Sequence, residues 1–230
     1  HGELRSIDKP IYHVNPDGSF VENREDAVNM DRVAFADGML ALPEALRRSV
    51  GGYYSVGIDQ VHYDEASGKY QFETDPLMRI AETGVDAVMV ACAAPEALRI
   101  TAPIADRLHA EFRQGLENME YNRCLVTFGA LPKVQSEDDF YGLCLPDAEI
   151  SPLRWFAFED QKCQGRQVEN WSSFVMHATA EASDALWDKS NREISAEMYA
   201  EARKYVDALP AECRWTRVKR WEIAHLKDPE

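Results

Sequence analysis

The first clear pattern along the chain is an alternation of apolar and polar positions over residues 54–63, where Val56 and Ile58 are separated by one small residue. A second strand-like run covers residues 69–74, and the stretch DEASG between the two runs is rich in turn-forming residues. Alternation with a period of two on both sides of a turn is typical of a β-hairpin. We therefore predict an antiparallel pair of strands over these two segments.

A continuous apolar run follows at residues 85–92, within the stretch VDAVMVACAAPEAL. Runs of this kind fit strands that are covered on both faces, as in the sheets of α/β proteins. Pro95 and Pro103 come next, and proline is tolerated in a first helical turn because the missing amide has no partner there. The pattern predicts a buried strand over residues 86–92, followed by helices that open at these two prolines.

Beyond residue 120 the chain alternates between strand-like stretches and one strong helix signal. Strand-like stretches cover residues 121–133, 151–160, 171–179 and 213–224. Residues 190–209 are predicted to form a helix, because Ser190 and Glu193 stand at the spacing of a capping box. The apolar positions of this helix fall on one face at helical spacing, and they are Ile194, Met198, Ala202, Tyr205 and Leu209.

The first half of the chain opens with polar, turn-rich sequence. We predict that residues 1–35 are irregular, apart from one short strand at residues 11–14. A helix is predicted around Pro43, with Glu44 in its first turn and Arg47 in its last. An acidic residue in the first turn and a basic residue in the last turn both interact favourably with the helix dipole.

Composition and charge narrow the class of protein. The formal net charge is −15 and no lysine- or arginine-rich run occurs, which argues against a nucleic-acid partner and against an anionic membrane surface. The five cysteines are odd in number and none form a CxxC pair. This argues against a disulfide framework and a structural zinc site, and it indicates free thiols in a reducing compartment. We expect a cytoplasmic protein.

The segment WSSFVMHATAEASDALW raises the question of what His177 does, because it follows a strand-like run and precedes a helix. The alternatives are a catalytic group, a metal ligand and a strand-end residue. No two histidines lie at i,i+2 or i,i+4, and no HExxH motif occurs, so we expect no metal at this site. Ser172 and Ser173 are near, but no GxSxG motif occurs. The sequence also holds neither GxGxxG nor GxxxxGK[ST], so it offers no recognisable phosphate cradle.

Several stretches, taken in order and spacing, carry a resemblance. They are GMLALPEAL (38–46), VGIDQVHYDEASGKYQFETD (56–75), DAVMVACAAPEAL (86–98), SPLRWFAFEDQK (151–162), WSSFVMHATAEASDALW (171–187) and VKRWEIA (218–224). Together they resemble the renalase-like, amine-oxidase-type FAD-dependent oxidoreductases. Two departures are large, because the family opens with a strand–GxGxxG–helix unit and closes with a Gly-Asp-containing strand and helix. The resemblance therefore covers the middle portion of such an enzyme.

The resemblance implies a mixed α/β fold, in which part of an FAD-binding sheet and a β-meander join an antiparallel-sheet substrate-binding domain with helices. It divides the chain into an irregular lead-in (1–35), a partial FAD-domain segment with the meander (36–100), a substrate-binding domain (101–212) and a strand returning toward the cofactor domain (213–230).

The resemblance also implies site residues. Cofactor contacts are expected at Val61, Ala93, Ala94, Pro95 and Trp221. The substrate pocket is expected at Trp155, Phe156 and His177, with His177 as a strand-end residue near the pocket. No catalytic acid or base is assigned, because a flavin accepts the hydride and the protein's task is to position the substrate.

The implied function is transfer of a hydride from a small amine or dihydropyridine-type substrate to FAD, by a portion or subunit of a flavoenzyme. FAD would be shared with missing segments or with a second polypeptide that carries the dinucleotide-binding βαβ unit. The alternative is a non-catalytic binding or assembly subunit that keeps the middle of the fold without flavin. Under the first hypothesis, the isolated chain is expected to be colourless and prone to self-association.

Overall fold

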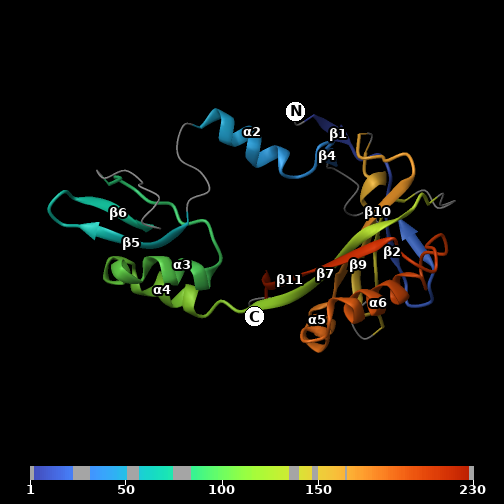
Figure 1. Cartoon of the computed structure of the whole chain (residues 1–230). Helices are drawn as coiled ribbons and strands as arrows, with labels where there is room; N and C mark the ends of the chain where they lie inside the picture. Colours follow the sequence, from blue (N-terminus) through green and yellow to red (C-terminus); the bar gives the residue numbers. More distant parts are fainter. Residues whose placement is uncertain are drawn as a thin grey trace. The chain divides into compact units, whose positions relative to one another are not determined.

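The computed structural model describes residues 3–22, 32–50, 57–74, 84–134, 140–146, 150–163 and 165–227. The chain forms two compact units, and each is described by itself (Figure 1). Unit 1 consists of His1–Ser49 and Asn122–His225, and unit 2 of Val50–Tyr121 and Leu226–Glu230. The fold is mixed α/β, with one large mixed sheet and two small antiparallel sheets, as the sequence predicted.

The large sheet of unit 1 has seven strands. In sheet order they are β11 (Trp215–Leu226), β7 (Tyr121–Pro132), β10 (Trp171–Ala178), β9 (Leu153–Phe158), β8 (Gly142–Cys144), β2 (Ile11–Val14) and β3 (Phe20–Glu22). β10 pairs antiparallel with both β7 and β9, whereas β2 runs parallel to β8. The strands predicted around residues 121–133, 151–160, 171–179 and 213–224 are confirmed.

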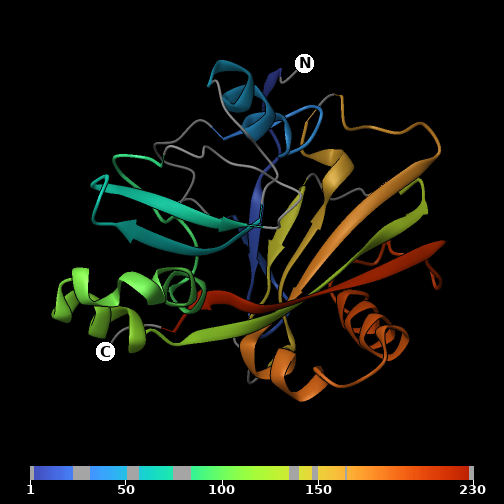
Figure 2. The same ribbon diagram turned by 60° about the vertical axis from the view of Figure 1, so that its left-hand side comes forward.

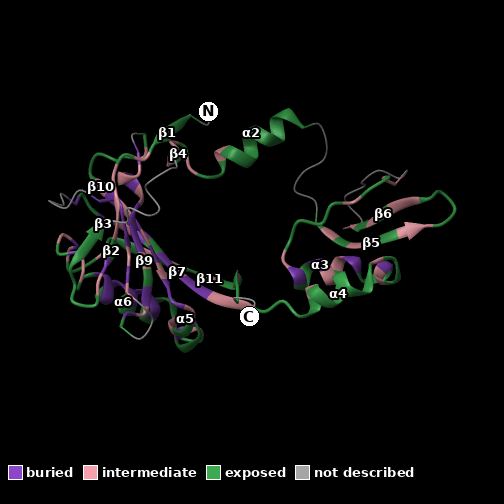
Figure 3. Ribbon diagram, turned by 180° about the vertical axis from the view of Figure 1, so that it is seen from behind, coloured by how far each residue is buried: buried purple, intermediate pink, exposed green. Residues whose placement is uncertain are grey.

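The sheet buries one face and leaves the other partly open. Along β10, intermediate and buried residues alternate without a break, so every second side chain enters the core. Helices α5 (Ala180–Leu186) and α6 (Asn191–Ala202) lie on the core face of the sheet (Figure 1), and the ribbon is coloured as buried on the strands they cover (Figure 3). Side chains of both helices belong to the hydrophobic core. Phe156, Phe174, Met176, Ile194 and Met198 form the centre of this core, each at most 1% exposed.

Helix α6 begins as predicted, because Ser190 and Glu193 form a complete capping box. The Ser190 Oγ accepts from the Glu193 N–H, and the Glu193 carboxylate accepts from the Ser190 N–H. The helix ends at Ala202, earlier than the predicted residue 209. Residues after it continue in turns that still bury Leu209, so the apolar stripe reaches the core without remaining helical.

The short strand predicted at residues 11–14 is confirmed as β2, but the prediction that the rest of residues 1–35 is irregular is wrong for the described part. Besides β2 and β3, β1 (Leu4–Ser6) pairs with β4 (Val33–Phe35). β2 pairs with β8, which lies far along the sequence, so the local pattern predicts this strand but not its partner. Helix α2 (Ala41–Ser49) is confirmed, with Glu44 in its first turn, and it buries no residue of its own.

Unit 2 contains the predicted hairpin. β5 (Ile58–Asp64) and β6 (Lys69–Thr74) pair antiparallel across the DEASG turn. Helix α3 (Ala94–Thr101), the 3₁₀ helix η1 (Ala102–Arg107) and helix α4 (Ala110–Glu117) follow, and the first two have proline in their first turns. In Figure 2 the hairpin and these helices form two layers of unit 2.

The predicted buried strand over residues 86–92 is wrong. Val85 makes one isolated bridge to Tyr70, and the chain then continues without strand structure. Met89 is 93% exposed and Cys92 is exposed. An apolar run becomes a buried strand only where strands flank it and helices cover it, and the described residues of unit 2 supply neither over this stretch. The expected boundary between the partial FAD-domain segment and the substrate-binding domain, at residue 101, falls at the end of α3. It therefore lies inside unit 2.

Candidate functional site

A row of side chains crosses the open face of the large sheet, the face opposite α5 and α6. The register pairs His13 with Cys144, Cys144 with Trp155, and Trp155 with His177. Paired residues on neighbouring strands point to the same face. The neighbouring row, which includes Phe156 and Met176, points to the core, so the alternation of each strand sends these four side chains to the open face.

Trp155 is held in place by a glycine on the next strand. A Cβ at Gly142 would lie 2.4 Å from the Trp155 ring, closer than atoms can approach. The indole therefore lies against the backbone of β8, and its edge meets Tyr141 with ring centroids 6.3 Å apart. Gly142 thus lets a large aromatic ring lie on the sheet surface.

His177 opens onto a cavity of about 680 Å³ that is also lined by His13, Cys144, Trp155 and His225. Its ring has no hydrogen-bond partner among the described residues. The expected strand-end position is observed, since His177 is the penultimate residue of β10.

The surroundings of His177 favour its neutral form. Burial is the largest cause that lowers the pKa of His177, and the nearby His225 lowers it further. Glu159 acts in the opposite direction, while Lys162 and Arg154 add to the lowering. Burial disfavours the charged form of histidine, and neighbouring cations act in the same sense.

A second hollow of about 510 Å³ continues along the open face and shares Trp155 and His177 with the first. Phe128 on β7 and Trp215 on β11 form its aromatic wall, edge to face with ring centroids 6.3 Å apart. Met39 also lines it. This hollow has the character of a small-molecule site, mostly apolar with few polar groups.

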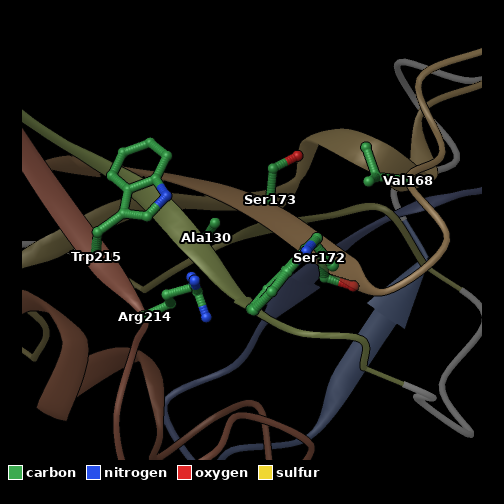
Figure 4. A pocket seen from close by; sticks show the side chains of 7 residues that line it. Ala130, Val168, Ser172, Ser173, Arg214 and Trp215 are labelled. Atoms are coloured by element: carbon green, nitrogen blue, oxygen red, sulfur yellow. The ribbon is translucent and has the colours of Figure 1, made fainter.

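A third hollow of about 330 Å³ lies farther along the same strands (Figure 4). Trp215, Ala130 and Ser173 line it from β11, β7 and β10. The Arg214 guanidinium lies 4.4 Å from the centre of the Trp171 ring. Because Trp215 and Ser173 also line the second hollow, the open face carries a continuous line of aromatic side chains.

The acidic groups beside this face are already paired. Glu159 accepts from Arg166 at 2.8 Å and pairs with Lys162 at 2.5 Å. Asp160 is 1% exposed; it pairs with Lys133 at 2.8 Å and accepts from the Ser173 N–H at 2.9 Å. Neither carboxylate is therefore available to bind a cationic ligand.

The structure brings two of the three expected pocket residues together. Trp155 and His177 are a cross-strand pair and line two of the hollows. Phe156 points the other way, is fully buried and packs edge to face on Phe158. Its assignment to the pocket is corrected, because adjacent strand residues face opposite sides.

The residues expected to touch a cofactor fall in both units. In unit 2, Val61 is 1% exposed on β5, and helix α3, which begins with Ala94 and Pro95 after Ala93, contacts β5. Trp221 lies on β11 in unit 1, half exposed, with the Lys219 ammonium 4.9 Å from its ring centre.

The described residues fit only part of an FAD molecule. A pyrophosphate needs converging free amides at a glycine turn and a helix N-terminus. At α3 the Ala94 N–H is donated to the Tyr121 hydroxyl at 3.0 Å, and at α6 the capping box occupies the first turn. The aromatic line of the open face suits a flat ring, whereas at the starts of α3 and α6 these amides are already engaged.

Several residues of the site were not singled out from the sequence. Cys144 and His13 join it through the short strands β8 and β2, and Trp215 through the pairing of β11 with β7. Only the tertiary register brings them together, so no sequence spacing marks them. Within the described ranges, no group of three or more histidine, cysteine or acidic side chains is arranged to hold a metal ion. The helices described there include none long and apolar enough to cross a membrane.

No protein-family model and no curated protein matches the sequence. Solved structures do match in fold. A putative protoporphyrinogen oxidase from Exiguobacterium sp. 255-15 aligns with a TM-score of 0.60 at 13% identity, over 84% of this chain and 41% of the other. Putrescine oxidase, bound to putrescine, aligns with a TM-score of 0.56 at 16% identity, over 81% and 39%.

Reduced UDP-galactopyranose mutase aligns with a TM-score of 0.54 at 14% identity, over 80% of this chain and 38% of the other. At these identities the likeness concerns the fold. The chain spans about two fifths of the length of the structures it matches.

Proposed function

We propose that this chain forms the substrate-binding part of an FAD-dependent oxidoreductase, in which a hydride passes from a small organic substrate to the flavin. The observation that carries the proposal is the open sheet face, where Trp155, Phe128 and Trp215 line adjoining hollows around His177. A flavin enzyme needs the donor carbon held against a flat ring in a dry, largely apolar site. An aromatic sheet surface without a strong acid or base suits that task.

The fold likeness supports the same hypothesis. Two of the matched proteins are named as oxidases, and one of them, putrescine oxidase, has been the subject of a redesign of its cofactor binding. The resemblance of the sequence to renalase-like and amine-oxidase-type enzymes points in the same direction. The finer features remain part of the proposal, namely a renalase-like enzyme and an amine or dihydropyridine-type donor.

We also propose that the pyrophosphate cradle for FAD lies outside this sequence, in another segment or in a partner chain with a GxGxxG-bearing βαβ unit. The 230 residues contain no such motif. The amide of Ala94 and the first turn of α6 are already engaged. A chain without the cradle lacks the anchor that fixes a dinucleotide.

The test measures the flavin content of the native complex, isolated from the cells that produce the protein. The tagged chain is purified from its own cells with the chains that bind it, and flavin released by acid is quantified per chain. We expect about one flavin per complex, with absorbance near roughly 450 nm, and almost none in the chain purified alone from a foreign host. Complexes that all lack flavin would contradict the proposal and favour the non-catalytic assembly subunit.

A further inference from the structure

The cavity of about 680 Å³ beside His177 is basic although the protein is acidic. The chain carries a formal net charge of −15, yet five of the cavity's lining residues are basic or can become so. They are His13, Arg123, Arg154, His177 and His225. Among the described residues of the lining the one acidic residue is Glu181, which is exposed in the first turn of α5. Arginine charge together with several nitrogen donors, gathered in one cavity of an acidic protein, points to an anionic ligand.

One of these cations is free to bind a ligand. Arg123 lies over the Trp187 ring and is within 3.8 Å of Asp184 and 3.7 Å of Glu222, so its charge is partly neutralised. Arg154 is exposed and forms no ion pair with any described residue. Its guanidinium therefore keeps its full hydrogen-bonding capacity at the cavity.

A β-bulge explains why an arginine stands here. His177 pairs with Trp155 and Ala178 with Leu153, so β9 has one extra residue, Arg154, at this point. The bulge lets Leu153 and Phe156, three residues apart, both enter the core, although strict alternation would separate them. Bulges redirect side chains and are frequent next to binding sites. Here the redirected side chain is the arginine in the cavity lining that has no ion-pair partner among the described residues.

We propose that this cavity binds the carboxylate group of a small organic anion, with Arg154 as its anchoring cation and the Trp155 ring as the wall for its apolar body. An arginine presents a planar fork of donors that matches a carboxylate with two hydrogen bonds. The ring of His177 beside it supplies a further donor.

The same arrangement disfavours a simple amine as the ligand. Glu159 and Asp160 are both engaged by cations, and Glu181 is the one carboxylate in the described lining of this cavity, so a cationic amine would meet the unpaired Arg154 with a single exposed carboxylate to offset it. Bringing like charges together in a partly buried cavity costs binding free energy. The identification of this anion with the enzyme's substrate rests on the proposed function, and it replaces the simple amine considered there by a donor that carries a carboxylate. The binding of the anion itself does not rest on the proposed function.

The test is calorimetric titration of the full chain, without flavin, with three probes. Benzoate and benzylamine share the aromatic ring and differ in charge, and inorganic phosphate is an anion without an apolar body. We expect benzoate to bind with a stoichiometry of one, phosphate to bind at least about tenfold more weakly, and benzylamine to show no saturable binding. The variant Arg154→Gln should weaken benzoate at least about tenfold, as expected for the loss of a charge-assisted hydrogen-bonded pair.

Two further variants separate charge, geometry and position. Arg154→Lys keeps the charge without the fork, so its affinity for benzoate should fall between those of the parent and Arg154→Gln. Arg192→Gln removes one positive charge from an exposed position of α6, outside the cavity lining, and should leave the affinity within about twofold, as an exposed charge is largely screened. Circular dichroism establishes that each variant is folded.

Benzoate binding that is unchanged in Arg154→Gln would overturn the proposal, and so would benzylamine binding as tightly as benzoate. Phosphate binding more tightly than benzoate would overturn the assignment to a carboxylate. None of these outcomes depends on flavin, so a failure here is distinct from a failure of the proposed function.

Discussion

His177 is half-buried at the end of β10, where its ring opens onto the basic cavity. The sequence left three roles open for it. The structure supports a strand-end residue that lines the pocket, because its cross-strand partner is Trp155. The expected position followed from the alternation of residues 171–178. The surroundings of the ring could not be predicted, because they depend on which strands lie beside β10.

The pKa of His177 predicts how acid affects folding. Burial, with His225 as the next cause, lowers this pKa below the ordinary value of 6.5. Below about pH 6.5 the unfolded chain takes up a proton before the folded chain does, so the free energy of unfolding falls as the pH drops toward the folded pKa. Well above pH 6.5, His177 is neutral in both the folded and the unfolded chain, so its protonation no longer lowers the free energy of unfolding.

The variant His177→Gln should therefore lose less stability than the parent between pH 7.5 and pH 5.5, values chosen about one unit above and below the ordinary histidine pKa. Urea unfolding midpoints of the parent and of His177→Gln at both pH values measure how much stability each protein loses. The same two proteins compared at about pH 8 give the effect of the substitution itself. An equal loss of stability in parent and variant would show that the pKa of His177 is not lowered by folding.

Among the helices and strands, the sequence predicted those whose signals are local. The capping box of α6, the alternation of β10 and the DEASG hairpin all lie within a few residues of the chain. The failures share one cause. Residues 86–92 lack flanking strands among the described residues, β1 depends on its pairing with the distant β4, and the bulge at Arg154 depends on the register with β10. These strand pairings join segments that are far apart in the chain, so a short stretch of sequence cannot predict them.

The pairing of β7 with β11 depends on a glycine. A Cβ at Gly129 would lie 2.3 Å from the Trp215 carbonyl oxygen and 3.0 Å from the Phe174 ring. The first neighbour is backbone, so β11 would have to move. Gly129→Ala should lower the free energy of unfolding of unit 1 by about 1–3 kcal/mol, the usual range for overpacking. It should also shift the fluorescence of Trp215 in the aromatic wall.

The matched control is Gly115→Ala in helix α4, where no atom lies within 4 Å of the added Cβ. There the same substitution should raise the stability of unit 2 by about 0.5–1 kcal/mol, because alanine favours the helix. Urea titrations of both variants give the two changes. If both substitutions changed the stability in the same direction, the close approach of the Trp215 carbonyl to Gly129 would not be what determines the effect of Gly129→Ala.

Across the chain as a whole, apolar surface remains uncovered. Helix α2 buries no residue, with Leu46 57% exposed, and Met89 is 93% exposed in the segment that was expected to be a buried strand. Exposed apolar residues gathered on one segment mark surfaces that associate with other protein. Under the proposed function these segments are surfaces that further sequence or a partner chain would cover. Self-association of the isolated chain was expected from a sheet edge at residues 85–92; no strand forms there, so exposed apolar segments replace that edge as the reason to expect it.

The proposed function requires that this chain contact the flavin ring and the substrate but provide no binding site for the pyrophosphate of FAD. A titration of FAD and of riboflavin into the purified chain, followed by flavin fluorescence, measures that difference. We predict weak binding of both, with affinities within about threefold of each other, because the pyrophosphate finds no cradle and meets an acidic protein. Tight, stoichiometric binding of FAD with much weaker binding of riboflavin would contradict the proposal, since it would show that the chain itself holds the pyrophosphate.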